Sequence, residues 1–116
     1  MSQAGNVRGG GGPIPPIVIQ GYKAITFADS PYTVQPTDYY ISADTSGGAI
    51  TVNFPDAPTE NTSYIIKDRT GDASINNITV KSLSGVTTVD EAASKPIAGN
   101  YGAMQLLYHS GNYEIF

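Results

Sequence analysis

The sequence predicts an all-β protein: a small module of antiparallel strands, either a β-sandwich or barrel-like, preceded by an extended N-terminal arm. Three observations lead to this prediction. Short apolar runs with period-two alternation recur from Ile17 to Phe116, turn residues separate them, and glycine (13), proline (8) and tyrosine (8) are abundant among the 116 residues. Period-two alternation places successive side chains on opposite faces of a strand, and Gly and Pro break the chain into short elements. We therefore divide the chain into an arm, residues 1–16, and a β-module, residues 17–116.

The arm is rich in glycine and proline, and it contains most of the residues that we predict to dock on a partner. These docking residues are Gly9, Gly10, Gly11, Gly12, Pro13, Ile14, Pro15, Pro16 and Ile17. The arm has too little apolar surface to offset its ordering entropy, so we do not expect it to fold alone. Its composition fits both a flexible linker and a docking peptide. In a docking peptide the glycine backbone could approach a partner closely, and Ile14 and Ile17 would be the apolar anchors.

The clearest strand is the run from Ala49 to Phe54. Ile50, Val52 and Phe54 share one face of this run, and Thr51 and Asn53 share the other. Half-buried strands show this alternation because one face packs on the core and the other faces solvent. We expect the three apolar side chains to be buried.

Seven further runs have a similar character and are predicted as strands: 17–20, 22–27, 39–43, 64–68, 78–81, 103–109 and 113–116. Within the run 78–81, Ile78 and Val80 are expected to face the same interior as Phe54. The last two runs are joined by Ser110-Gly111-Asn112, which predicts a β-hairpin. One helical signal competes at 88–93, where a capping-box spacing precedes two alanines; it predicts at most one turn.

Charge and hydropathy exclude several classes of partner. The net charge is −4 and the isoelectric point is near 4.6. Nucleic acid is therefore not an expected partner, because phosphates attract clustered Lys and Arg. The basic residues are scattered: Arg8, Lys23, Lys67, Arg69, Lys81 and Lys95. No apolar run approaches the roughly 20 residues of a membrane-spanning helix, so we expect no membrane insertion.

No catalytic, metal-binding or cofactor-binding residues are predicted, and we expect a protein that is not an enzyme. His109 is the single histidine, and its neighbours in the sequence include no carboxylate that could orient it as a catalytic base. The segment Asp68-Arg69-Thr70-Gly71-Asp72 lacks the full calcium-loop pattern. Most acidic residues stand beside Gly, Pro, Ser or Thr, where Asp stabilises turns. An enzyme would need a cleft with converging carboxylates.

The tyrosines permit two interpretations. They are Tyr22, Tyr32, Tyr39, Tyr40, Tyr64, Tyr101, Tyr108 and Tyr113. Tyrosine is a favourable strand residue that pairs well across strands, and we favour this role. Aromatic rings on a surface can also pack against the apolar face of a sugar.

The β-module resembles bacteriophage tail-fibre and appendage proteins from about Tyr32 to Phe116. The residues that carry the resemblance are Tyr32-Thr33-Val34, Thr37-Asp38-Tyr39-Tyr40-Ile41, Gly48-Ala49-Ile50-Thr51-Val52-Asn53-Phe54-Pro55, Tyr64-Ile65-Ile66-Lys67-Asp68, Asn77-Ile78-Thr79-Val80, Tyr101-Gly102-Ala103-Met104 and Gly111-Asn112-Tyr113. The opening Met1-Ser2-Gln3-Ala4-Gly5 with its Gly-rich continuation is similar to the virion-attachment ends of some phage fibres.

This resemblance implies a structural component of a virion, made in the host cytoplasm. It would be a short fibre, an adaptor or a decorating subunit, and its arm would anchor it to another virion protein. The resemblance also implies a homo-trimer. The rival hypothesis is a small carbohydrate-binding or adhesin module that uses surface tyrosines to bind a glycan of the host surface.

Overall fold

The computed structural model describes residues 15–116, so the predicted docking residues from Gly9 to Ile14 lie outside the described part of the chain. The described elements are the strands Tyr22–Thr26 (β1), Tyr32–Thr33 (β2), Tyr40–Asp44 (β3), Ile50–Phe54 (β4), Ser63–Asp68 (β5), Ile78–Ser82 (β6), Thr88–Val89 (β7), Ser94–Ile97 (β8), Ala103–His109 (β9) and Asn112–Ile115 (β10), and one 3-10 turn, Phe27–Asp29 (η1). The all-β prediction is confirmed.

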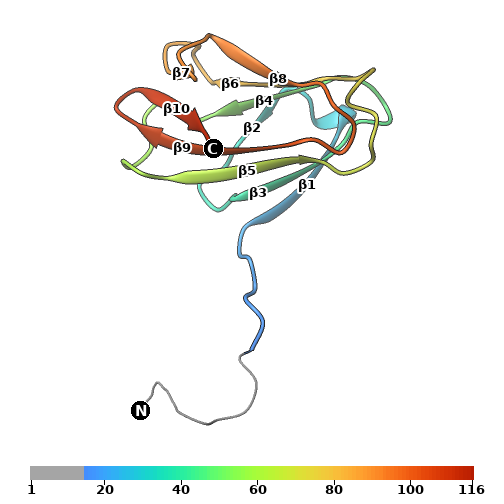
Figure 1. Cartoon of the computed structure of the whole chain (residues 1–116), viewed down its shortest axis with the longest axis horizontal. Coiled ribbons are helices and arrows are strands. Elements are labelled where there is room, and N and C mark those ends of the chain that lie inside the picture. Colours follow the sequence, from blue (N-terminus) through green and yellow to red (C-terminus); the bar gives the residue numbers. More distant parts are fainter. Residues whose placement is uncertain (1–14) are drawn as a thin grey trace.

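The strands form two sheets that lie one above the other (Figure 1). The first sheet has the order β1-β3-β5-β9-β10-β7, and the second has the order β2-β4-β6-β8. From β1 to β6 the chain alternates between the sheets, and each strand lies parallel to the preceding strand of its own sheet. The chain from β1 to β6 therefore winds like a short β-solenoid, which we call the coil. Successive turns of this coil stack on each other along the direction of the backbone hydrogen bonds between strands.

The predicted antiparallel arrangement is wrong for the coiled part, because both sheets are mixed. Only β5 with β9, β9 with β10, and β6 with β8 pair antiparallel. The period-two pattern of a strand is the same in both pairings, so alternation alone could not distinguish them. The connections decide the pairing, because each link in the coil crosses to the other sheet instead of turning back as a hairpin.

Most predicted strands are present to within one or two residues at each end, and one predicted strand is wrong. The run 17–20 forms no strand, because no neighbouring strand pairs with it. No helical turn forms at 88–93, where Thr88 and Val89 pair with β10 instead. The predicted hairpin is confirmed between β9 and β10, with positive φ at both Ser110 and Gly111.

The core lies between the sheets, and the predicted core residues are confirmed. Ile50, Val52 and Phe54 are at most 1% exposed, and Ile78 and Val80 are fully buried. The register stacks similar side chains on each other, since Ile50 pairs with Ile78 and Val52 pairs with Val80. Side chains of the same type and size therefore stack in successive layers of the interior.

Aromatic rings fill one end of the same core. Phe54 packs against Tyr64 and Tyr113 with ring centroids 5.1 and 5.9 Å apart. The Tyr113 hydroxyl donates a hydrogen bond of 2.6 Å to the carbonyl of Pro55. Burial raises the pKa of Tyr113, so its neutral hydroxyl is the form that the core stabilises. Phe54 therefore joins the apolar layers to this aromatic cluster.

We expect the substitution Phe54→Ala to lower the free energy of unfolding by about 3–5 kcal/mol, because it leaves a cavity among the packed rings. Urea unfolding followed by circular dichroism measures the change. The matched control is Ile75→Ala, since Ile75 is 83% exposed and should tolerate truncation. An unchanged unfolding curve for Phe54→Ala would show that the register of β4 is wrong.

Candidate functional site

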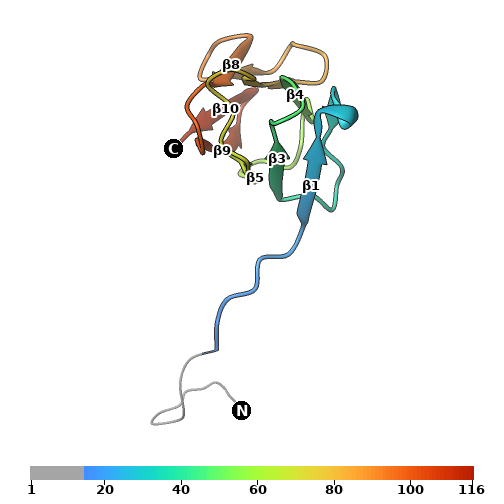
Figure 2. The ribbon, with the colours of Figure 1, turned by 90° about the vertical axis from the view of Figure 1, so that its right-hand side faces the viewer.

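The segment before β1 exposes a continuous apolar surface. Ile17, Val18 and Ile19 are 93%, 71% and 51% exposed, and Pro15 and Pro16 before them are also exposed. Figures 1 and 2 show this segment leaving the β-module and running away from both sheets. Of the predicted docking residues, Pro15, Pro16 and Ile17 are therefore described, and all three face solvent.

A glycine fixes where this segment meets the first sheet. Gly21 has φ of +79°, and an added Cβ would lie 2.6 Å from the carbonyl oxygen of Thr37. The carbonyl of Gly21 accepts hydrogen bonds from the N–H groups of Tyr39 and Tyr40, at 2.8 and 3.0 Å. Only glycine adopts this conformation without strain at so close an approach. The attachment point of the exposed segment is therefore rigid.

Strand β1 has a free edge at the same end of the molecule. Within residues 15–116, no strand pairs with the side of β1 that faces away from β3. Backbone groups alternate along a strand, and Gly21 bonds toward β3, so Tyr22 and Ala24 direct their N–H and C=O groups outward. The next outward N–H, that of Thr26, is covered by the Asp29 carboxylate at 2.8 Å. The backbone groups of Tyr22 and Ala24 therefore remain available for pairing with a further strand.

The other edge strands are better protected. Next to Thr33 of β2, the Gln35 side chain donates a hydrogen bond of 2.8 Å to the Thr33 carbonyl. Strand β8 carries Lys95 and Pro96, and β7 has only two residues. Lysine, proline and short length all discourage pairing with a further strand. Among the described strands, β1 is therefore the edge most open to an additional strand.

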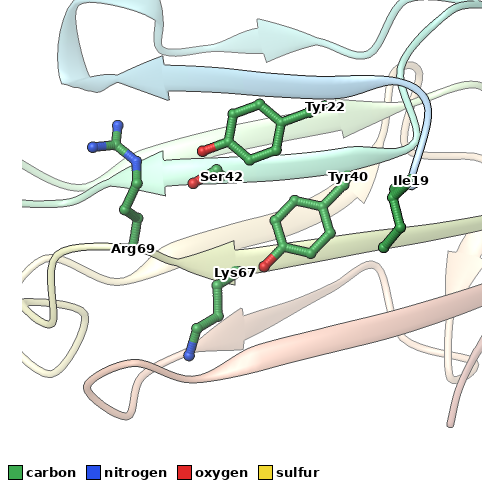
Figure 3. Close-up of a pocket in the computed structure, with 6 residues that line it drawn as sticks. All are labelled: Ile19, Tyr22, Tyr40, Ser42, Lys67 and Arg69. Carbon is green, nitrogen blue, oxygen red and sulfur yellow. The ribbon is translucent and has the colours of Figure 1, made fainter. Parts of the chain in front are cut away.

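A groove lies on the outer face of the first sheet, beside β1. Its volume is about 430 Å³, and it is lined by Ile19, Tyr22, Tyr40, Ser42, Lys67 and Arg69 (Figure 3). The parallel register places Tyr22 beside Tyr40 and Ala24 beside Ser42, so two rings stand next to two small side chains. The rings are nearly parallel, with an interplanar angle of 14° and centroids 5.6 Å apart. The groove follows from this difference in side-chain size.

The two cations of the groove are held differently. The Lys67 ammonium donates a hydrogen bond to the carbonyl of Tyr101 and lies 5.7 Å from the centre of its ring. The backbone N–H of Arg69 bonds to the carbonyl of Ala43 at 2.7 Å, which fixes the start of its side chain. Within residues 15–116, the Arg69 guanidinium makes no ion pair. Arg69 therefore offers its charge to the groove more freely than Lys67 does.

A buried carboxylate separates the two cations in the sequence. Asp68 stands between them and is fully buried. One of its oxygens accepts a hydrogen bond of 2.8 Å from the Thr45 hydroxyl, and the other accepts bonds from the N–H groups of Ala73 and Tyr101 at 3.1 and 2.9 Å. Gly71 adds a further N–H donor at 3.1 Å. These donors belong to three separate loops, so Asp68 connects them.

Hydrogen bonding determines the charge state of Asp68. Burial alone would raise its pKa, but the bonds from Thr45, Tyr101, Gly71 and Ala73 outweigh burial and hold the pKa below its ordinary value. The carboxylate is therefore ionised at neutral pH, although no cation pairs with it within residues 15–116. Sequence reasoning missed this role because the turn-forming neighbours of Asp68 predicted only a local turn.

His109 has a carboxylate partner that the local sequence did not show. Its Nδ1 lies 2.9 Å from Oε1 of Glu60, and the two side chains are 57% and 52% exposed. The Glu60 carboxylate also accepts hydrogen bonds from the N–H of Ser110, at 3.1 and 3.2 Å. An exposed pair of this kind at a hairpin end contributes little energy and supports the turn.

Residues 15–116 contain no group of three or more His, Asp or Glu side chains placed to hold a metal ion. In the same range, no helix is both long enough and apolar enough to cross a bilayer. The exposed segment, the β1 edge and the groove are the candidate surfaces for binding a partner or a ligand.

Two comparisons with known proteins give no match. No protein-family model and no curated protein sequence matches the chain. The function must therefore be argued from the residues and their geometry.

We expect Asp68→Asn to lower the free energy of unfolding by at least about 2 kcal/mol at pH 7, because an amide turns a donor toward buried N–H groups. The folded pKa of Asp68 is depressed, so its contribution is complete above the unfolded value of about 3.9 and disappears as pH falls through the folded pKa. The difference between wild type and variant should therefore shrink below about pH 4.

Chemical unfolding at a series of pH values measures this difference. Asp72→Asn is the matched control, since the Asp72 carboxylate accepts no hydrogen bond within residues 15–116 and lies in the same loop. A pH-independent difference for Asp68→Asn would contradict an ionised Asp68.

Proposed function

We propose that the protein is a structural component of a bacteriophage virion, a short fibre, adaptor or decorating subunit that is anchored to another virion protein by its N-terminal arm. The observation that carries this proposal is the concentration of exposed apolar residues and unpaired backbone at one end of the coil. The resemblance to phage fibre and appendage proteins suggests that the partner of this end is another virion protein. The β-module then serves as a rigid body that the arm holds in place.

The exposed segment has the composition of a docking peptide. Contiguous apolar residues that face solvent generally mark a surface that a partner covers. Full burial of Ile17 and Val18 would contribute about 1.5–3 kcal/mol each. Pro15 and Pro16 restrict the backbone before binding, which reduces the conformational entropy lost on docking. Because the turn at Gly21 is rigid, a docked arm would also fix the orientation of the β-module.

The open edge of β1 supports an assembly role in a second way. An extended peptide can add a strand to a free sheet edge, and backbone hydrogen bonds then supply much of the affinity. Tyr22 and Ala24 offer outward N–H and C=O groups for such a strand. An arm anchored through Ile17 and Val18 would bring a partner close to this edge.

We expect a deletion of residues 1–16 to give a protein that folds and melts as the full chain does but is missing from purified particles. The reason is that the first strand begins at Tyr22, whereas residues 1–16 contain eight of the nine predicted docking residues; Ile17 and Val18 remain in this variant and are tested separately. Quantitative immunoblotting or mass spectrometry of particles measures the occupancy. Incorporation of the truncated chain at normal occupancy would mean that the β-module carries the attachment surface.

The double variant Ile17→Ser, Val18→Ser tests the anchors without shortening the chain. Loss of two apolar side chains that docking would bury should weaken binding to the particle by at least about tenfold and so lower occupancy, since each tenfold change in affinity corresponds to about 1.4 kcal/mol. Ile75→Ser is the matched control, because Ile75 is 83% exposed and lies in the loop between β5 and β6.

A homo-trimer is the expected assembly, on the basis of the resemblance to phage fibres and of the apolar surface exposed by a single chain. Native mass spectrometry and light scattering of the purified full chain measure the mass. A trimer should persist at micromolar concentration. A stable monomer in the same range would refute the trimer but leave the docking of the arm to the particle experiment.

A further inference from the structure

We infer that the groove on the outer face of the first sheet is a binding site for an acidic carbohydrate, a polymer of pyranose sugars that bear carboxylates. The inference goes beyond attachment to the virion and does not depend on it. It rests on three features that meet in one groove: a pair of aromatic rings, hydroxyl groups without partners, and two cations.

The aromatic pair forms a platform. Figure 3 shows the rings of Tyr22 and Tyr40 face-on and side by side over the strands, with both hydroxyls directed toward the same end of the groove. Tyr22 is 60% exposed, so its ring is accessible from solvent. The C–H groups on one face of a pyranose carry partial positive charge and pack favourably on the negative face of an aromatic ring. Two adjacent rings suit a chain of sugars better than a single one.

The floor of the groove contains a polar group that a ligand can satisfy. Ser42 is only 3% exposed and lines the groove next to the Tyr22 hydroxyl, on the side of the rings toward Arg69 (Figure 3). Within residues 15–116, its hydroxyl makes no hydrogen bond, and the same holds for the hydroxyls of both tyrosines. A buried hydroxyl without a partner is unfavourable, and each of these groups can both donate and accept. Sugar hydroxyls have the same dual character and are suitable partners.

The charge of the groove selects for an anion. The lining includes Lys67 and Arg69 and no acidic residue, whereas the whole chain carries a net charge of −4. Hydrogen bonds from the hydroxyl and N–H of Ser46, at 2.6 and 2.9 Å, lower the pKa of the Asp44 carboxyl, and the Arg69 charge adds to this effect. Within residues 15–116, however, the side chains of Asp44 and Arg69 form no ion pair. The Arg69 guanidinium can therefore bind a ligand carboxylate through two parallel N–H donors.

The shape of the groove orders these contacts along one direction. In Figure 3 Ile19 lies at one end, Arg69 lies at the other, and the hydroxyl of each tyrosine points toward the cationic end. A sugar that stacks on the rings would direct its carboxylate toward Arg69 and its hydroxyls toward Ser42. The volume of about 430 Å³ is in the range of sites for small ligands.

The test is a calorimetric titration of the full chain with oligosaccharides of galacturonic, mannuronic and sialic acid. At least one acidic oligosaccharide should bind, and a neutral maltooligosaccharide of the same length should bind at least about tenfold more weakly. Polyphosphate of matched charge should also bind at least about tenfold more weakly, because it offers charge without sugar faces. Absence of binding to all the acidic sugars, or equal binding of polyphosphate, would overturn the inference.

Substitutions locate the site. Tyr40→Ala and Arg69→Gln should each weaken binding by about tenfold, whereas Tyr40→Phe should retain most of the affinity because it keeps the ring. Phe116→Ala and Lys95→Gln are controls, since they remove an exposed aromatic ring and a cation outside the groove. Tyr22→Ala, at an exposed position, provides the ring test again if Tyr40→Ala does not fold. Unchanged affinity in both ring variants would exclude this groove as the binding site.

Deletion of residues 1–16 separates this inference from the proposed attachment. That chain keeps all six residues of the groove and should bind the acidic oligosaccharide as the full chain does. Loss of particle occupancy with retained sugar binding would support both proposals. Retained occupancy with no sugar binding in the full chain would refute both.

Discussion

The buried carboxylate of Asp68 is the constraint on which the arrangement of this surface depends. A charge removed from water is tolerated only when hydrogen bonds replace its hydration. Its donors come from the turn after β3, from the loop between β5 and β6, and from the loop before β9. The Asp68 carboxylate thereby holds together three connections: the one after β3, the one after β5, and the loop that leads into the antiparallel strand β9. Lys67 depends on it too, because its acceptor is the carbonyl of Tyr101, a residue whose N–H bonds to Asp68.

The register of the coil connects the core to the outer surface. Inside the sheets, Ile50 pairs with Ile78, and outside them Tyr22 pairs with Tyr40. Side chains alternate between faces along every strand, so a slip of one residue would expose the apolar set and bury the tyrosines. The burial that stabilises the fold therefore also specifies which aromatic rings meet on the surface. The pairing of the two tyrosine rings follows from the register alone, whereas the position of Lys67 in the groove depends on Asp68 through Tyr101.

Local sequence patterns predicted which side chains are buried but not which strands are neighbours. The alternation in β4 identifies its inner face whatever strand lies beside it. No comparable sequence pattern indicated that the strands of the coil pair in parallel. The advance from Tyr22 to Tyr40 is shorter than that from Tyr40 to Ile65, so the turns of the coil leave no repeat of fixed period. The shortest strands, β2 and β7, were missed because two residues cannot display alternation.

The groove and the carboxylate could not be read from the sequence for a related reason. Asp68 bonds to a backbone N–H 33 positions away, at Tyr101, and Ser42 faces Lys67 through strand pairing. Backbone donors have no residue signature, since every residue except proline carries one. The same applies to Glu60, which meets His109 only because β5 and β9 pair. Contacts of this kind depend on topology, and the topology was the part of the fold that alternation left undetermined.

Strand β1 contributes to two separate surfaces of the first sheet, namely its free edge and its outer face. Backbone groups of β1 lie in the plane of the sheet, whereas its side chains stand perpendicular to that plane. A strand added at the edge would therefore extend the sheet and leave the groove open. Tyr22 belongs to both surfaces, because its backbone faces the edge and its ring belongs to the platform. An aromatic residue placed beside Tyr22 by such a strand would lengthen the platform, and an acidic one would compete with a ligand for Arg69. In an assembly through this edge, the identity of that neighbour would determine whether ligand binding in the groove becomes stronger or weaker.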